Sequence, residues 1–213
     1  MLRALESVYG RPTGGAVKDP LSELIFTILS QHTSDTNRDR AWASLWSAFD
    51  SWEAIATAPR RSVERAIRMG GLAPTKSRVI QQVLKQVRAQ EGGYTLDRLR
   101  CLSMEEVEGV LRAFRGVGLK TIRCVQVFSL GQPAFPVDTH IYRITRRLGL
   151  VPLKATPEKA HEIMQALTPP SEVLPFHMNL ITHGRRVCKA QRPLCGECVV
   201  RSRCLYYRET RQD

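Results

Sequence analysis

The stretch Arg115-Gly116-Val117-Gly118-Leu119-Lys120 separates two helical patterns and decides how the rest of the chain is interpreted. Apolar residues at helical spacing lie on both sides of it: Val107, Val110, Leu111 and Phe114 before, and Ile122, Val125 and Phe128 after. The two glycines allow backbone conformations that other residues avoid, and they leave main-chain N–H groups uncovered where the second helix begins. Such a helix start binds phosphate through its free donors and its dipole. The stretch therefore predicts a helix–hairpin–helix motif for a nucleic-acid backbone, while an ordinary turn between helices also fits it.

Helical periodicity extends outward from this motif over most of the chain, and strand-like alternation never continues beyond a few residues. Helix starts are indicated by the pairs Asp19-Pro20 and Thr156-Pro157 and by Ser103 with Glu106 three positions later. Helix ends are indicated by Gly70-Gly71 and Gly92-Gly93. The predicted fold class is therefore all-α, with a last helix over about residues 173–187 and a loop-like tail.

Composition narrows the partner class. The chain of 213 residues has 32 Lys and Arg against 20 Asp and Glu, a formal net charge of +12. This surplus favours a polyanionic partner, either nucleic acid or an anionic membrane surface. A hydrophobic content of 43% is that of a folded protein rather than a disordered one. No apolar run is long enough to span a bilayer, and the first 17 residues lack the layout of a signal peptide, so we expect an intracellular protein with reduced thiols.

Lys120 and Asp138 are candidate reactive groups. Lys120 follows the hairpin directly, and Asp138 stands eighteen residues later at the start of the next predicted helix. A lysine amine is a nucleophile only when neutral, and burial or a helix N-terminus favours the neutral form. Asp138 could accept a proton or stabilise developing positive charge. The alternatives are a solvated surface lysine and an aspartate that only caps its helix.

Four cysteines near the end of the chain form the pattern C-x6-C-x2-C-x5-C: Cys188, Cys195, Cys198 and Cys204. Four thiolates without a histidine at ligand spacing suit structural zinc or an iron–sulfur cluster, and spacing alone does not choose between them. Arginines and lysines surround these cysteines and would present positive charge to a nucleic-acid backbone. Cys101 and Cys124 lie apart from the group, on predicted helices, and are expected to be core thiols.

Taken together, these segments resemble endonuclease III, a family in the helix–hairpin–helix superfamily of DNA glycosylases. The matching segments are residues 116–121 (GVGLKT), residues 137–141 (VDTHI), residues 183–185 (HGR) and the four-cysteine tail. Two further segments look like the family's DNA-probing loops: Leu29-Ser30 with Thr33 and Asp35, and Gly71-Leu72 with Lys76. The resemblance covers nearly the whole chain.

The resemblance implies a fold of two helical domains with a DNA-binding groove between them. Residues 19–133 would form a six-helix domain that carries the helix–hairpin–helix motif. Residues 1–18 would join residues 134–213 in a second domain, which would bear a [4Fe–4S] cluster on the four cysteines.

The resemblance also implies an activity: a bifunctional DNA glycosylase and AP lyase of base excision repair. Lys120 would be the nucleophile and Asp138 its partner. The enzyme would flip a damaged base, typically an oxidised pyrimidine, out of double-stranded DNA. Lys120 would displace the base at C1′, and the resulting Schiff base would allow β-elimination, which nicks the strand 3′ to the lesion. Abasic sites would be substrates for this second step.

The DNA contacts implied by the resemblance fall on eight residues: His32, Leu72, Gly116, Val117, Gly118, Thr121, His140 and Arg185. Leu72 would be a wedge that fills the vacated stack, and His32 would touch the orphaned base. The alternatives are a core position for Leu72 and a capped helix end for His32. The chain departs from the family pattern at Arg115, where proline is common, at His32, where glutamine is common, and at Ala73-Pro74, where an aromatic and a polar residue are common.

Two other functions remain open. One is a glycosylase with negligible lyase activity, and the other is a non-catalytic iron–sulfur protein that binds DNA or senses redox state. The pair Lys120 and Asp138 favours an enzyme over a pure binder. We expect a monomer in a bacterial cytoplasm, associated with the nucleoid and not with a membrane. The lesion and the opposite base are not predicted.

Overall fold

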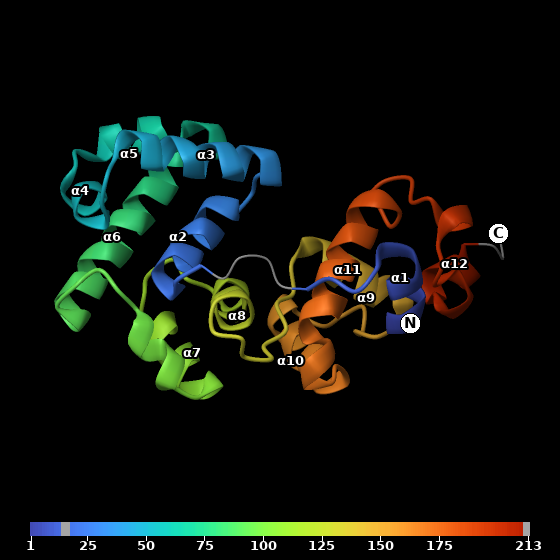
Figure 1. Cartoon of the computed structure of the whole chain (residues 1–213). Coiled ribbons are helices and arrows are strands. Elements are labelled where there is room, and N and C mark those ends of the chain that lie inside the picture. The colour runs from blue at the N-terminus through green and yellow to red at the C-terminus, as the bar shows by residue number, and fades with distance from the viewer. Residues whose placement is uncertain (14–17, 211–213) are drawn as a thin grey trace. The chain divides into compact units, whose positions relative to one another are not determined.

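The computed structural model describes residues 1–13 and 18–210, and this part of the chain consists of helices, turns and irregular segments (Figure 1). The all-α prediction is therefore confirmed. The chain divides into two compact units, residues 17–131 and residues 1–16 with 132–213. The domain boundaries expected from the sequence, 18/19 and 133/134, lie close to these divisions. The first division falls at residues 14–17, which are outside the described part of the chain.

The unit of residues 17–131 contains seven α-helices in its described residues: α2 (Pro20–Ser30), α3 (Asp35–Ala48), α4 (Trp52–Thr57), α5 (Arg60–Ala66), α6 (Ala73–Glu91), α7 (Met104–Arg112) and α8 (Leu119–Phe128). Two 3₁₀ turns join them, η1 (Arg68–Gly70) and η2 (Asp97–Cys101). The sequence led us to expect six helices. The additional one is α4, whose 6 residues are too few to display a helical period.

Helix α2 lies at the centre of this unit's core and packs against α3, α6 and α8. Its fully buried residues are Leu21, Leu24, Ile25, Ile28 and Leu29. Each such side chain contributes about 1.5–3 kcal/mol through removal of apolar surface from water. The predicted cap is confirmed, because Asp19 Oδ1 accepts a hydrogen bond from the Ser22 N–H at 2.9 Å and Pro20 opens the helix. This packing fixes α8, which carries Lys120.

The second unit is discontinuous in sequence. Its helices are α1 (Leu2–Tyr9), α9 (Thr139–Leu148), α10 (Pro157–Leu167), α11 (Val173–Arg186) and α12 (Leu205–Glu209), with 3₁₀ turns η3 (Pro170–Glu172), η4 (Cys195–Glu197) and η5 (Arg201–Arg203). Helix α1 packs against α11, as Figure 1 shows, and Leu5 is fully buried there. Phe135 and Phe176 meet edge to face with ring centroids 5.9 Å apart. No described helix combines the length and the apolar content that crossing a bilayer requires.

Candidate functional site

The predicted hairpin joins α7 to α8 through residues 113–118. Gly116 has φ +87°, and a Cβ at this position would lie 2.9 Å from Val79 Cγ2 on α6, so both conformation and packing require glycine. Gly118 is the N-cap of α8 and offers no side chain to accept from the first N–H groups of that helix. A Cβ at Gly118 would meet nothing within 4 Å. The helix start is thus uncovered and can approach a phosphate.

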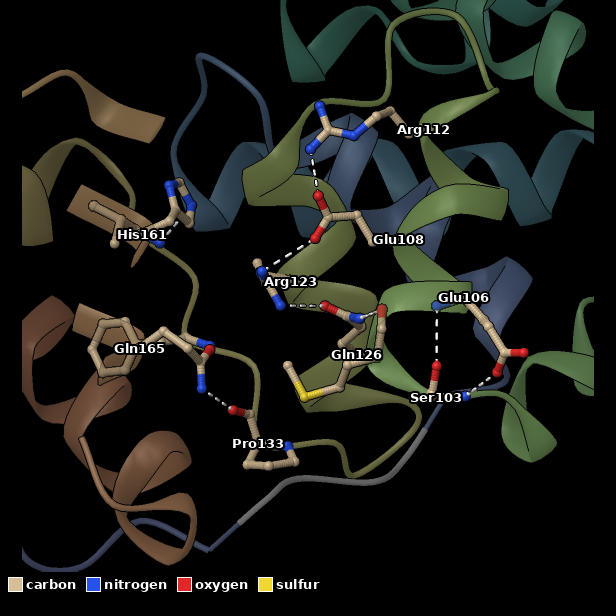
Figure 2. Close-up of polar contacts among 12 residues, drawn as sticks. Ser103, Glu106, Glu108, Arg112, Arg123, Gln126, Pro133, His161 and Gln165 are labelled. Carbon is tan, nitrogen blue, oxygen red and sulfur yellow. Dashed lines mark hydrogen bonds and ion pairs between the residues drawn. The ribbon is translucent and has the colours of Figure 1, made fainter. Parts of the chain in front are cut away.

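Polar contacts clamp α7 and α8 together beneath the hairpin, as Figure 2 shows. Gln126 on α8 is fully buried, and its Nε2 donates to the Met104 carbonyl at the start of α7 at 2.7 Å. Glu108 on α7 pairs with Arg123 on α8 at 3.1 Å. The predicted Ser103–Glu106 capping box is present at the start of α7. The hairpin is therefore held by two rigidly connected helices.

Lys120 is the second residue of α8, and its side chain is half-buried. On α2, Glu23 is a buried carboxylate whose Oε1 accepts a hydrogen bond from Thr27 Oγ1 at 3.1 Å. Burial raises the pKa of this carboxyl, while the positive charges of Lys18, Lys120 and Arg38 lower it. Lys120 therefore lies within electrostatic range of an acid in its own unit. Sequence reasoning missed Glu23, because a single carboxylate in an apolar helix carries no motif.

Asp138 belongs to the other unit, where it is the N-cap of α9. Its Oδ1 accepts a hydrogen bond from the Ile141 N–H at 2.8 Å, and the residue is half-buried. The capping role considered from the sequence is therefore real. Because this bond holds Oδ1 in place, it also fixes the orientation of the second carboxylate oxygen, Oδ2. The pairing of Asp138 with Lys120 stays a prediction.

The two predicted DNA-probing loops share an unusual backbone conformation. His32 has φ +50° and Leu72 has φ +48°, in the left-handed region that non-glycine residues rarely enter. Both side chains are exposed, and Leu72 keeps 54% of its surface accessible, so the core alternative for Leu72 is wrong. Gly71, between them in space, has φ +68°, and its Cβ would lie 4.0 Å from the His32 carbonyl oxygen. The loops therefore lie side by side.

The remaining predicted DNA contacts differ in accessibility. Val117 and Thr121 are buried, so these residues could reach DNA only through their main chain. Arg185 is exposed in the last turn of α11. His140 on α9 is half-buried, and a Cβ on Gly184 of α11 would lie 2.9 Å from the His140 Cβ. The glycine of the HGR segment is thus explained by close helix packing.

The four predicted cysteine ligands line one cavity, together with Arg147 and Tyr206. All four are free thiols. The core position expected for Cys124 is confirmed, whereas that for Cys101 is wrong, because Cys101 ends the short turn η2 and is exposed. Burial raises the pKa values of Cys198 and Cys204, and the negative charges of the neighbouring thiolates raise them further. Four thiolates held so close repel one another unless a metal centre neutralises them. The donor set and its electrostatics therefore fit an iron–sulfur cluster. Four thiolates also suit structural zinc, so the donor set alone does not choose between the two.

Arginines of α9 hold the cysteine segment in place, a role that the sequence did not indicate. Arg143 donates to the carbonyls of Gly184 and Cys188 at 3.0 and 2.8 Å. Arg147 donates to the Lys189 carbonyl at 2.7 Å and lies over the Tyr206 ring, 4.6 Å from its centroid. The sequence predicted a backbone-binding role only for the arginines and lysines around the four cysteines. Arg143 and Arg147, outside that group, bind main-chain carbonyls.

Two family models match the chain. Residues 25–170 match the HhH-GPD superfamily of base excision DNA repair proteins, and residues 188–204 match the iron–sulfur binding domain of endonuclease III. A "putative DNA glycosylase" of Arabidopsis thaliana is 39% identical over 180 residues, 84% of this chain and 58% of that protein. Endonuclease III of Thermotoga maritima is 34% identical over 205 residues, 96% of this chain and 92% of that protein. The chain thus spans little more than half of the Arabidopsis relative and nearly all of the Thermotoga one.

Solved structures give the same result. A trapped covalent intermediate of endonuclease III with DNA, an estranged-adenine complex, superimposes with a TM-score of 0.85 at 25% identity. The match covers 99% of this chain and 95% of that one. The fold therefore agrees with that of a relative solved in complex with DNA.

Proposed function

Since the chain belongs to the HhH-GPD superfamily of base excision DNA repair proteins, and within it to the endonuclease III family, we propose that it is a bifunctional glycosylase and AP lyase. Its family makes it a DNA glycosylase. The finer proposal is that it removes oxidised pyrimidines from double-stranded DNA and then nicks the strand by β-elimination. DNA that already contains an abasic site would be a substrate for the strand-nicking step alone.

The observation that supports this proposal is the position of Lys120 in the hairpin. Gly118 caps α8 without a side chain, and Lys120 lies two positions further along the same helix. A phosphate bound by the uncovered N–H groups would be held next to the lysine amine. The relative solved as a trapped covalent intermediate with DNA supports a covalent step in this family. Phosphate binding and formation of the covalent bond to the sugar would thus both take place at the first turn of α8.

The proposed chemistry balances as follows. The lone pair of neutral Lys120 Nζ forms a bond to C1′ while the glycosidic bond breaks, and the base leaves with the electron pair and takes up a proton. Opening of the sugar gives an iminium ion. Loss of a proton from C2′ then expels the 3′ phosphate, and water hydrolyses the imine to free Lys120. The carboxylate of Asp138 would stabilise the positive charge on the sugar and accept a proton.

The cofactor proposed for the cysteine-lined cavity is a [4Fe–4S] cluster on Cys188, Cys195, Cys198 and Cys204. It would fix the segment around which Arg143 and Arg147 are arranged, and so it would act on structure and not on the bond-breaking steps. We further propose a monomer that works on DNA in a bacterial cytoplasm. Homologues crystallised with DNA support the nucleic-acid partner.

Trapping with borohydride tests the covalent step. Wild-type protein is mixed with a duplex that contains one abasic site, and reduction should convert the Schiff base into a stable protein–DNA adduct. Lys120→Ala should give no adduct. Lys85→Ala, at an exposed lysine of α6, is the matched control and should trap like the wild type. Absence of any wild-type adduct would count against the lyase, and DNA binding without base release on any lesion would leave a binding protein.

Asp138 is tested with two substitutions that separate its cap from its charge. Asp138→Asn keeps an oxygen that can accept from the Ile141 N–H, whereas Asp138→Ala loses both the cap and the charge. We expect Asp138→Asn to melt like the wild type and to release bases about 10²–10⁴-fold more slowly. Equal base release by Asp138→Asn and wild type would restrict Asp138 to capping. A panel of single-lesion duplexes, scored for base release and nicking, would then define the substrate.

A further inference from the structure

We propose that Lys76 is a positioning residue that ties the His32 loop to the Leu72 loop, so that both side chains enter a DNA duplex as one rigid element. The inference rests on the proposed function, since it concerns how the enzyme opens its substrate. It gives a role to Lys76, which was named from the sequence within the second DNA-probing segment without a function of its own.

The side chain of Lys76 connects the two loops through hydrogen bonds. Its side chain projects from the first turn of α6 and is only 2% exposed. Nζ donates one hydrogen bond to the Leu29 carbonyl near the end of α2 and one to the Gly70 carbonyl at the end of η1, each at 2.7 Å. Leu29 lies three residues before His32, and Gly70 lies two residues before Leu72. One buried ammonium group therefore bonds to the chain just before each exposed residue.

Burial of this lysine is costly and calls for an explanation. Lysine is rarely buried without an acidic partner. In the described part of the chain, both hydrogen bonds of the Lys76 ammonium group go to main-chain carbonyls. Burial lowers the pKa of Lys76 to about 8. A leucine or methionine would fill the same volume without the penalty of a desolvated charge. We therefore infer that the ammonium group of Lys76 acts through its two hydrogen bonds.

The bonds of Lys76 hold loops that are otherwise unfavourable. A left-handed conformation is unfavourable at a residue with a Cβ, and it persists only where the surroundings over-determine it. His32 and Leu72 both adopt it. The main-chain N–H groups of Thr75 and Lys76 also donate to the Leu72 carbonyl, at 3.1 and 2.9 Å. The Leu72 turn is thus bound to α6 by main chain and tied to α2 by Nζ.

Rigidity matters because a wedge works against base stacking. Unstacking and flipping a nucleotide costs a few kcal/mol. A leucine on a flexible loop would swing away and leave the gap to close. A leucine that cannot move relative to His32 fills the gap at once and holds the opposite strand. Lys76 therefore acts on the duplex only through Leu72 and His32.

The test compares duplex and single-stranded substrates for Lys76→Met, which removes the donors and keeps the apolar stem. The matched control is Lys85→Met, an exposed position on the same helix. Trapping on single-stranded abasic DNA needs Lys120 but no wedge, because there is no stack to open. We expect Lys76→Met to trap single-stranded abasic DNA within about twofold of wild type and to lose roughly tenfold or more in base release from duplex DNA, a factor that equals about 1.4 kcal/mol. Lys85→Met should match wild type on both.

A double-mutant cycle with Leu72→Ala separates positioning from a general loss of structure. If Lys76 acts through the wedge, Lys76→Met should cost little in the Leu72→Ala background, so that the two losses do not add. Additive losses, or equal losses on both substrates, would overturn the proposal. If Lys76→Met does not fold, Lys76→Leu, which also removes the donors and keeps an apolar side chain, should show the same duplex defect, and wild-type duplex activity in it would overturn the proposal as well. If the wild-type protein traps neither substrate, this result would refute the proposed lyase activity and not the positioning role of Lys76.

Discussion

The phenolic oxygen of Tyr9 lies 2.9 Å from Nδ1 of His183, and this hydrogen bond joins α1 to α11 across 174 positions of sequence. On its other side, His183 Nε2 lies 3.5 Å from Cys198 Sγ. Burial lowers the pKa of His183, so the ring is neutral near neutral pH. If the Tyr9 hydroxyl donates to Nδ1, the single ring proton is on Nε2 and points at the sulfur. Tyr9 on α1 thereby sets the hydrogen bonding of Cys198, one of the proposed cluster ligands.

Tyr9→Phe should therefore change the bound cluster without removing it. An N–H donor to a thiolate ligand stabilises the reduced state, so loss of the hydroxyl that fixes this tautomer should shift the midpoint potential to a more negative value. The measurement is a voltammetric or dye-mediated titration, with cluster absorbance as the loading control. Tyr142→Phe is the matched control, since its hydroxyl bonds to the Ala155 carbonyl in the same unit. Identical potentials in all three proteins would contradict the assignment of the ring proton.

Two helical glycines should respond to alanine with opposite signs. At Gly184 a Cβ would lie 2.9 Å from the His140 Cβ and 3.0 Å from Ile144 Cδ1, so Gly184→Ala should force α9 and α11 apart and cost about 1–3 kcal/mol. At Gly109, in α7, a Cβ would meet nothing within 4 Å, and Gly109→Ala should stabilise by roughly 0.5–1 kcal/mol through helix propensity. Thermal melts of the two variants decide. A rise in melting temperature for Gly184→Ala would show that the helices can move apart freely.

The hairpin glycines should also differ. Gly116→Ala meets both a positive φ and the Val79 side chain, so it should lower the free energy of unfolding by about 1–3 kcal/mol and weaken DNA binding. Gly118→Ala has φ −93° and open space around the new Cβ, so its cost should stay below about 1 kcal/mol. Urea unfolding measures the first effect, and binding of undamaged duplex at fixed salt measures the second. Equal destabilisation by the two changes would mean that neither the positive φ of Gly116 nor its contact with Val79 is costly.

Glu23 should give a pH-dependent stability difference. Burial raises the pKa of its carboxyl in the folded protein, so the unfolded chain loses this proton first as the pH rises. Ionisation of Glu23 therefore reduces stability above its ordinary pKa, and the reduction is complete only above the raised value. Glu23→Gln, which keeps a polar side chain facing Thr27, should be more stable than wild type at pH 7.5, with an advantage that shrinks as the pH falls toward 4. Urea unfolding across this range tests it, and an advantage that grows at low pH would contradict the stated cause.

The sequence predicted the features that depend on neighbouring residues. The caps at Asp19, Ser103 and Thr156 are confirmed, because each lies within three positions of the N–H that it accepts from. The family and the all-helical fold are confirmed as well, since residue order in the hairpin and the cysteine tail carries them.

Features that depend on distant packing were not predicted. A lysine on a helix is expected in solvent, and only the assembled fold encloses Lys76 between two carbonyls. Arg143 and Arg147 show the same limit, because an arginine that binds main-chain carbonyls has the same sequence pattern as one that faces a phosphate. The contact of Tyr9 with His183 has no local signature at all.

The unit that carries the cysteines is built from two separate segments of the chain, and this arrangement has a consequence for biosynthesis. Residues 17–131 form one continuous segment, so they can fold as soon as they leave the ribosome. Helix α1 emerges earlier, but its partner α11 spans Val173–Arg186, and the ligand cysteines follow later still. Helix α1 must therefore wait, without its docking partner, while the whole intervening segment is translated. Iron loading would then follow the docking of α1 against α11.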